Sequence, residues 1–339
     1  MSGTEMLRPQ VAFMQRKPRN VGNYSVEFIF EDVRSRLAGM IDAKVVISPY
    51  ESSGFFKRLA SCVYAFRNQG QVNHVTGDVN FIGILLDKKK TVSTVLDCVY
   101  LTNSSGIKYR ILRFFWLSLP ERRARFLTAI SESTKKEILR HHPCDPDKII
   151  VIPVAISPSF KFVEKTFNKE CPRILQLGTA PNKNIPRLIE ALKGIPCILH
   201  IVGKRIPEYE SALLANGISY EYESGLSDAE ILDRYQKSDI VTLVSTYEGF
   251  GMPILEAQAV GRPVITGNTF SMPEVAGDAA VLVDPENVEE IRRGFERIIG
   301  DDAFREALIS KGLRNTARFD PDVIAQQYLE LYRKIALES

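Results

Sequence analysis

The stretch that decides the fold reads Asp239-Ile240-Val241-Thr242-Leu243-Val244-Ser245-Thr246-Tyr247-Glu248-Gly249-Phe250-Gly251-Met252-Pro253-Ile254-Leu255-Glu256. Residues 239–244 are rich in β-branched side chains and predict a strand. A helix is predicted to begin near Met252-Pro253, because proline suits the first helical turn, where its missing N–H is not needed. The turn between them holds Gly249 and Gly251. A strand, a glycine turn and a helix in this order predict one βα unit of a parallel α/β sheet.

The same glycine turn predicts an anion site. In open parallel sheets, ligands bind beside the carboxyl ends of the strands, and backbone N–H groups at a helix N-terminus attract phosphate. The helix after the turn is almost wholly apolar, so Glu256 within it is costly unless its carboxylate accepts hydrogen bonds, for which a ligand's hydroxyl groups would serve. Glu248 projects from the loop toward the same crevice. The residues alone leave open that Glu248 caps the helix and that Glu256 pairs with an arginine.

Short β-branched runs alternate with helical patterns along the chain, which predicts an α/β fold of parallel sheets crossed by helices. The predicted strands are 11–14, 44–48, 72–75 and 91–96, then 173–177, 197–202, 219–222, 239–244 and 263–266. Two prolines within 152–158 interrupt regular structure. We therefore predict a first domain over 1–155 and a second over 156–320. Residues 321–339 are predicted to form a helix that docks back on the first domain.

Length and composition bound the class of protein. A chain of 339 residues exceeds the size at which single cores usually stop growing, and 45% hydrophobic with 25% charged residues excludes disordered and collagen-like classes. No apolar run reaches the roughly 18 residues that span a bilayer, and residues 1–10 lack the apolar core of a signal peptide. We expect a cytoplasmic protein. The five cysteines are far apart, so reduced thiols are expected.

Charge is distributed unevenly between the two predicted domains. Residues 1–155 hold 23 Lys and Arg against 14 Asp and Glu, a net of +9, whereas residues 156–339 hold 21 against 27, a net of −6. The basic half suggests an anionic partner, such as a phosphate-bearing acceptor or peripheral contact with the inner face of a membrane. A solvated basic face explains it equally well. No nucleic-acid partner is expected.

The pattern Glu248-x7-Glu256, inside Glu-Gly-Phe-Gly-Met-Pro-Ile-Leu-Glu-Ala, resembles the signature of retaining family 4 glycosyltransferases. That family has the GT-B architecture, in which two Rossmann-like domains face each other across a cleft. The resemblance implies that Glu248 holds hydroxyls of a donor sugar and that Glu256 holds the ribose of its nucleotide. The amides that would meet the diphosphate are those of Gly249, Phe250, Gly251 and Met252. Family members usually need no metal, so none is expected.

A second segment supports the resemblance. Residues 174–184, Ile-Leu-Gln-Leu-Gly-Thr-Ala-Pro-Asn-Lys-Asn, resemble the family's first strand and loop of the nucleotide domain, where a lysine reaches the donor diphosphate. Gly178, Thr179 and Lys183 are therefore predicted to bind the donor, with a surface lysine at a helix start as the less favoured alternative for Lys183. Lys204, which follows a predicted strand, could add charge at the same site or be an ordinary solvated residue.

In the first domain, Thr94-Val95-Leu96-Asp97 stands where the family commonly has Thr-x-His-Asp, with the histidine facing the reacting sugar. Leu96 cannot donate a hydrogen bond, so either another group serves the reaction or activity is weak. Asp97 is predicted to be catalytic, with the capping of a turn as the alternative. Residues 16–27 resemble the family's acceptor-side loop. The residues singled out there are Arg16, Gly22, Asn23 and Ser25.

Two other motifs are rejected. Asp145-Pro146-Asp147 matches the Asp-x-Asp of metal-using sugar transferases of a different fold, but a proline turn explains it. The adjacent His141 and His142 cannot share one helix face, so no metal site is predicted there. A nicotinamide dehydrogenase is excluded, because no Gly-x-Gly-x-x-Gly follows the first strand of either domain.

The resemblance implies transfer of a sugar, with retained anomeric configuration, from a nucleotide-diphosphate-sugar to a saccharide or lipid-phosphate-linked acceptor. Polysaccharide, lipopolysaccharide or glycolipid biosynthesis is the setting this implies. Lys183, Glu248 and Asp97 are the predicted catalytic residues, and no cofactor is expected, since the nucleotide sugar is a substrate. Two rival functions stay open. One is a nucleotide-sugar 2-epimerase, which needs no acceptor, and the other is a nucleotide-sugar-binding or scaffolding protein that has lost turnover.

Overall fold

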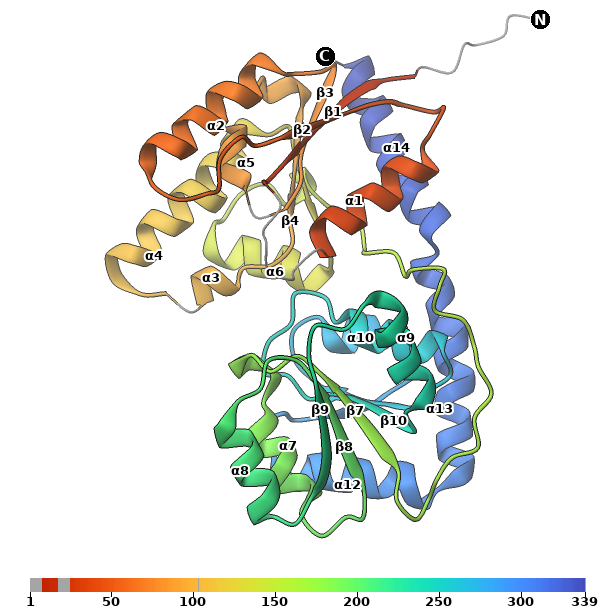
Figure 1. The fold of residues 1–339 in the computed structure, drawn as a ribbon. Coiled ribbons are helices and arrows are strands. Elements are labelled where there is room, and N and C mark those ends of the chain that lie inside the picture. Colours follow the sequence, from red (N-terminus) through yellow and green to blue (C-terminus); the bar gives the residue numbers. More distant parts are fainter. Residues whose placement is uncertain (1–7, 18–24, 78, 103, 339) are drawn as a thin grey trace, which may run out of the picture. The chain divides into compact units, whose positions relative to one another are not determined.

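The computed structural model describes residues 8–338, apart from 18–24, 78 and 103. Contacts within the chain divide it into two compact units, the first made of residues 1–155 and 321–339 and the second of residues 156–320. Each unit is built on a six-stranded parallel sheet with helices (Figure 1). The predicted α/β class is confirmed in both units.

The sheet of the first unit has the order β2-β1-β3-β4-β5-β6. Its strands are β1 (Gln10–Gln15), β2 (Asp42–Ile47), β3 (Val72–Val75), β4 (Thr91–Val95), β5 (Phe126–Ala129) and β6 (Ile149–Val151). The first four lie within one or two residues of the strands that the sequence predicts. Most of these strands are buried on both faces, which explains why they read as apolar runs without strict alternation.

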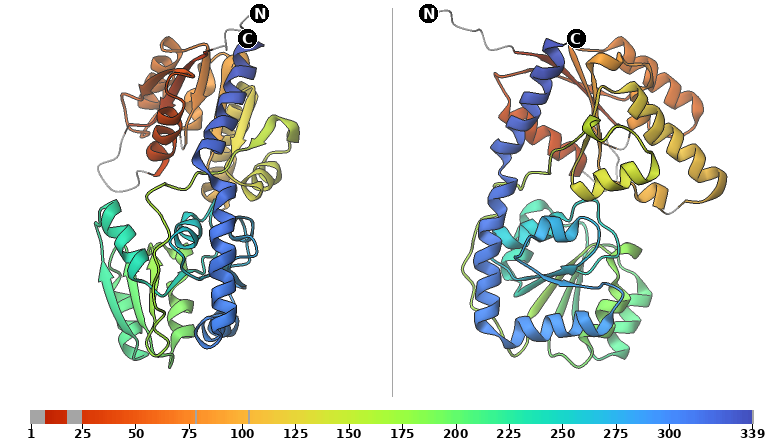
Figure 2. Two further views of the ribbon diagram at one scale, coloured as in Figure 1. Left: turned by 90° about the vertical axis from the view of Figure 1, so that its right-hand side faces the viewer. Right: turned by 180° about the vertical axis from the view of Figure 1, so that it is seen from behind.

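Helices cover both faces of this sheet. Val11 and Phe13 of β1 pack with α1 (Ser25–Arg36) and α14 (Pro321–Leu337). Their neighbours Ala12 and Met14 point the other way and pack with α2 (Phe55–Arg67). Figures 1 and 2 show α1 and α14 side by side. The other helical segments described in the unit are α3 (Val99–Thr102), α4 (Gly106–Arg113), the π-helical turn η3 (Phe114–Ser118), α5 (Leu119–Arg123), α6 (Glu132–His141) and the short 3₁₀ helices η1 (Asn80–Leu85), η2 (Lys88–Lys90) and η4 (Pro146–Lys148).

A buried polar chain fixes α14 to this sheet. Tyr332 of α14 lies 2.7 Å from Nδ1 of His74, and the His74 Nε2 lies 2.7 Å from the Thr94 hydroxyl. Thr94 in turn lies 2.6 Å from the Thr128 hydroxyl. Burial, with a smaller contribution from nearby Arg34, lowers the pKa of His74 to about 3, so the imidazole is neutral. The segment after residue 320 therefore belongs to the core of the first unit.

The sheet of the second unit has the order β12-β11-β10-β7-β8-β9. Its strands are β7 (Arg173–Leu177), β8 (Ile198–Val202), β9 (Ser219–Glu223), β10 (Ile240–Leu243), β11 (Val264–Gly267) and β12 (Val281–Val283). The helices are α7 (Ile185–Leu192), α8 (Pro207–Ala215), α9 (Asp228–Lys237), α10 (Met252–Ala259), α11 (Met272–Ala276), α12 (Val288–Gly300) and α13 (Asp302–Asn315). The five strands predicted here are confirmed, whereas β12 was not predicted.

The strand order of the second unit reverses at its centre. β7 pairs with β8 on one side and with β10 on the other, so the chain winds outward from β7 in both directions. At such a switch point the loops after the two central strands diverge and leave a crevice at the carboxyl edge, where ligands bind in folds of this kind. The loops that follow β7 and β10 are the two segments that carry the sequence motifs.

Among the described residues, no helix combines the length and the apolar character that crossing a membrane requires. The five cysteines are free thiols, as expected.

Candidate functional site

The glycine turn after β10 ends in a backbone conformation that favours glycine. Gly251 occupies the position just before α10 with φ 104°, in the left-handed region, and a Cβ added there would lie 3.1 Å from the Ile254 side chain. A residue with a side chain is disfavoured at this position by both effects. Proline stands in the first turn of α10, as predicted. Helix starts carry N–H groups without intrahelical acceptors and a positive dipole end, which together favour an anion.

Ser271, which lies between β11 and α11, fixes the orientation of this turn. Its hydroxyl, fully buried, lies 2.8 Å from the carbonyl oxygens of both Glu248 and Phe250 and donates toward them. In a planar trans peptide the carbonyl and the following N–H point in opposite directions. The N–H groups of Gly249 and Gly251 therefore face away from Ser271. Ser271 had no predicted role, although its position just after a strand of the same edge was a usable signal.

Lys183 and Glu248 meet at the carboxyl edge of the sheet. The Lys183 Nζ lies 2.6 Å from the Glu248 Oε1, and only 17% and 14% of the two side chains are exposed. Gly178 has φ 80°, and a Cβ there would lie 3.0 Å from the Lys183 Cε, so glycine leaves room for the lysine stem. The structure thus brings together two of the predicted catalytic residues, from loops 65 positions apart. The alternative of a solvated surface lysine is wrong.

Asparagines join the loop after β7 to the loop after β10. The Asn182 side chain donates to the Tyr247 carbonyl at 2.9 Å, and the Thr246 N–H donates to the Asn182 carbonyl at 2.8 Å. Asn184, in the left-handed conformation at φ 58°, donates from its side chain to the Val244 carbonyl at 3.0 Å. These bonds hold Lys183 between two fixed points. Neither asparagine was predicted to have this function.

The Glu256 carboxylate accepts a hydrogen bond from a tyrosine within the protein. Tyr235 of α9, fully buried, donates its hydroxyl to the Glu256 carboxylate. Burial raises the pKa of Glu256 to about 7, and nearby Asp228 adds to the rise, whereas the Tyr235 bond and Lys183 oppose it. The alternative in which Glu256 pairs with an arginine is wrong, because Glu256 has no arginine partner among the described residues. The alternative in which Glu248 caps α10 is also wrong, because no side chain caps this helix and Glu248 pairs with Lys183.

Thr179 and Lys204 contact each other beside β8. The Thr179 hydroxyl donates to the Lys204 carbonyl at 2.8 Å, and the Tyr222 hydroxyl donates to the same carbonyl at 2.7 Å. Thr179 is buried, whereas the Lys204 side chain is exposed. The Thr179 hydroxyl thus joins the loop after β7 to the loop after β8. Donor binding by Thr179 and by Lys204 stays a prediction.

In the first unit the structure shows a local contact for one predicted residue, Asp97. The Asp97 carboxylate accepts from the Val99 N–H at 3.0 Å at the start of α3, and Leu96 is half-buried after β4. Arg16 is buried directly after β1, and Ser25 begins α1. Gly22 and Asn23 lie outside the described residues. The capping that the sequence left open for Asp97 is observed, and its catalytic role stays a prediction.

The rejected metal motifs are explained by ordinary contacts. Asp145 accepts from the Asp147 N–H at 3.0 Å in a short 3₁₀ turn with Pro146, as predicted. His141 lies 3.1 Å from the Tyr109 hydroxyl, and His142 lies 3.2 Å from the Ser118 hydroxyl. Within the described part of the chain, no group of three or more His, Cys, Asp or Glu side chains has a metal-binding arrangement.

Two Rossmann-like units, one with a glycine turn and an ion pair at its switch point, define the GT-B class. The fold comparison supports this class across the whole chain. The lipopolysaccharide glycosyltransferase WaaG matches with a TM-score of 0.71 at 16% identity, over 95% of this chain and 99% of that one. HepE from Anabaena, solved with UDP-glucose, matches with a TM-score of 0.76 at 14% identity, over 96% of this chain and 100% of that one. At such identities the likeness shows the fold alone.

Residues 159–314 match the family described as "Glycosyl transferases group 1", which covers nearly all of the second unit. The family match therefore concerns the second unit and does not extend to the first. It is 28% identical over 234 residues to O-antigen chain mannosyltransferase B of Escherichia coli, with 62% of this chain covered. The aligned residues span 61% of that protein's length. In a second comparison, with the serotype-specific mannosyltransferase WbdA of the same species, the aligned residues span 32% of the relative's length.

Proposed function

We propose that this chain is a retaining glycosyltransferase whose second unit binds a nucleotide-diphosphate-sugar donor. The observation that carries the proposal is the partly buried ion pair of Lys183 and Glu248 beside the glycine turn. The pair places one cation and one carboxylate at the N-terminus of α10, where the amides of Gly249 and Gly251 are turned away from Ser271. A diphosphate needs the cation and the amides, whereas a sugar needs a carboxylate acceptor for its hydroxyls.

Each group then has its own part of the donor. Lys183 and the amides of residues 249–252 bind the diphosphate, Glu248 binds sugar hydroxyls, and Glu256 binds the ribose. Donor binding exchanges partners, because the diphosphate takes Lys183 and the sugar hydroxyls take Glu248. The pair keeps both charges satisfied until the donor arrives, so neither partly buried charge is left without a partner.

Several groups must share the catalytic task. A rate gain of about 10⁶ needs about 8 kcal/mol, whereas a helix terminus contributes roughly 0.3–1 and a charged hydrogen bond roughly 1.5–3. Lys183 and the turn amides act together on the charge that develops on the leaving diphosphate. The departing phosphate itself removes the proton of the acceptor hydroxyl, as the family resemblance implies, so a protein base is not needed for this step.

The first unit is proposed to bind the acceptor, a saccharide or a lipid-phosphate-linked saccharide. Asp97 is its proposed catalytic residue, and Arg16, Gly22, Asn23 and Ser25 are its proposed acceptor-side residues. The names of the mannosyltransferase relatives make a nucleotide-mannose the first donor to test and polysaccharide biosynthesis the first setting to consider.

The test is to incubate the full chain with a panel of nucleotide sugars, with and without saccharide and lipid-phosphate acceptors, and to measure free nucleoside diphosphate. Release that depends on an acceptor is the expected result, and the anomeric configuration of the product then reports retention. A donor converted without release would replace the proposal with epimerisation. Binding without conversion would replace it with a nucleotide-sugar-binding protein, for which Leu96 in place of the family histidine would be the reason.

A further inference from the structure

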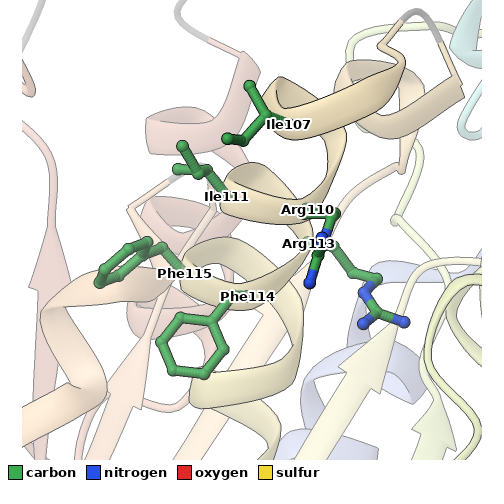
Figure 3. A pocket seen from close by; sticks show the side chains of 6 residues that line it. All are labelled: Ile107, Arg110, Ile111, Arg113, Phe114 and Phe115. Carbon is green, nitrogen blue, oxygen red and sulfur yellow. The ribbon is translucent and has the colours of Figure 1, made fainter.

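Helix α4 and the turn η3 present an apolar stripe to solvent. Ile107, Ile111, Phe114 and Phe115 follow the spacing i, i+4, i+7 and i+8, which places them on one helical face. All are exposed, Ile107 by 77% and Ile111 by 51%. In Figure 3 Ile107, Ile111 and Phe115 project from the same side of the helix, and Arg113 points away from them. Together with Arg110 and Phe114 these residues line a surface hollow.

Helix α2 has the same character. Its inner face buries Ser61, Cys62 and Ala65 against the sheet of the first unit. Its outer face carries Phe55 and Phe56, which are 70% and 82% exposed, with Leu59 and Phe66 exposed beside them. A surface helix normally directs a single apolar stripe toward the core. α2 has a second one, whose four side chains are each at least 45% exposed to solvent.

The two stripes belong to neighbouring elements. The Arg58 guanidinium of α2 lies 4.9 Å from the ring centre of Trp116 in η3 and 5.9 Å from that of Phe81. Figure 1 shows α2 and α4 on the same side of the first unit's sheet, opposite α1 and α14. We name Phe55, Phe56 and Leu59 of α2 with Ile107, Ile111 and Phe115 of α4 and η3 the apolar patch.

Every charged residue in the two segments is basic. Residues 52–77 contain Lys57, Arg58 and Arg67 and no Asp or Glu, and residues 98–120 contain Lys108, Arg110 and Arg113 and likewise no acid. Lys57, Lys108 and Arg110 are exposed next to the apolar side chains. The second unit differs, because its described exposed large apolar residues are few and dispersed: Phe162, Val163, Leu214 and Leu282.

We propose that the apolar patch binds the surface of a lipid bilayer that contains anionic phospholipids. Large aliphatic and aromatic side chains on an exposed amphipathic helix can enter the boundary between headgroups and acyl chains. The surrounding Lys and Arg side chains complement the negative headgroups. Exposed apolar residues gathered on neighbouring elements mark an interaction site, and the basic residues of both segments favour an anionic partner. This inference goes beyond the proposed sugar transfer and does not rest on it.

The experiment is flotation of the purified full chain with vesicles of phosphatidylcholine alone and vesicles of equal parts phosphatidylcholine and phosphatidylglycerol. The wild type should bind the anionic vesicles more strongly, and added salt should weaken this binding. Ile107→Ser with Ile111→Ser should reduce the partition coefficient about tenfold or more, because the loss of two large apolar side chains removes most of the insertion of α4. The matched control is Leu214→Ser on α8, also exposed at 69%, which should bind as the wild type does.

A second pair of variants tests the charge. Lys108→Glu with Arg110→Glu should lower binding to anionic vesicles about thirtyfold or more, since each basic residue near such a surface contributes roughly 1 kcal/mol and the new carboxylates are repelled by the headgroups. Lys193→Glu, an exposed change in the second unit, should have little effect. Equal binding of the wild type to both vesicle types, no binding to either, or full binding by the isoleucine variant would overturn the proposal. So would a concentration-dependent dimer that the isoleucine variant abolishes, because a second copy would then occupy the patch.

Discussion

The two units share one architecture but use the carboxyl edges of their sheets differently. In the second unit the loops after β7 and β10 converge on Lys183 and Glu248 and are tied together by Asn182 and Ser271. In the first unit the polar groups in and after β4 serve the fold, because Thr94 contacts His74 and Asp97 caps α3. The comparison teaches that a six-stranded parallel sheet does not by itself make a site. A site needs charged groups whose present partners a ligand can replace.

The largest expected effect comes from removing the ion pair of the second unit. Lys183→Ala and Glu248→Ala should each lower turnover by about 10²–10³-fold, which corresponds to about 2.7–4 kcal/mol of transition-state stabilisation. Release of nucleoside diphosphate measures this. Lys193→Ala is the control, since Lys193 is exposed after α7 in the same unit. Near-normal turnover in Lys183→Ala would remove the main difference between the two units.

The buried carboxyl of α10 predicts a pH dependence of stability. A pKa of about 7 in the folded protein, against an ordinary value of 4.5, means that the folded state binds a proton more readily than the unfolded state between these values. The free energy of unfolding should therefore fall as pH rises from about 4.5 to 7, by roughly 3 kcal/mol from this group. Glu256→Gln should abolish that part of the fall.

Urea unfolding at pH 5 and pH 8 measures the effect, with Glu208→Gln on α8 as an exposed control. An unchanged pH dependence in Glu256→Gln would show that the carboxyl carries its charge at little cost.

Ser271 should act as a positioning residue. Ser271→Ala leaves the carbonyls of Glu248 and Phe250 without their hydroxyl partner, and turnover should fall about tenfold through loss of one or two hydrogen bonds. The control is Ser238→Ala, because Ser238 is also buried and donates to a backbone carbonyl, that of Arg234. Both variants should lose similar stability, and only the first should lose turnover. Equal turnover in Ser271→Ala and Ser238→Ala would show that Ser271 contributes to the fold only.

Substitution of Asp97 in the first unit is expected to change stability and turnover the least. Asp97→Ala should lower the free energy of unfolding by about 1 kcal/mol, since it removes the cap of α3. Asp97→Asn should restore stability, because its side-chain oxygen still accepts the hydrogen bond. If Asp97 is also catalytic, Asp97→Asn should keep a turnover defect of up to about tenfold. Full recovery of turnover in Asp97→Asn would show that Asp97 only caps the helix.

Local sequence patterns predicted what local forces determine. The strand at 239–244 and the helix after Pro253 follow from β-branched residues, the glycine turn and the proline, all within one segment. β12 escaped prediction because Val281–Val283 is too short for a periodic signal and gains its pairing only from β11. The resemblance identified Lys183 and Glu248 individually, but their 2.6 Å contact depends on the β7 and β10 pairing.

Partners that are distant in sequence were the part that could not be predicted. The Tyr235 bond to Glu256 and the two Ser271 bonds join separate βα units, and only their packing brings these atoms together. The same holds for His74 and Tyr332, which are 258 positions apart. In each of these pairs, the local sequence around one residue does not indicate which distant residue it contacts. The second apolar face of α2 also needed the structure, because the sequence shows an apolar helix without showing which face the sheet covers.

The central claim is that the carboxyl edge of the second unit binds the diphosphate of a nucleotide sugar. Calorimetric titration of the full chain with nucleoside diphosphates and with the matching nucleosides tests it most directly. We expect the diphosphate to bind at least about tenfold more tightly than the nucleoside, and Lys183→Ala to remove most of that difference. Equal affinity for nucleoside and diphosphate in the wild type, or an unchanged difference in Lys183→Ala, would contradict the claim.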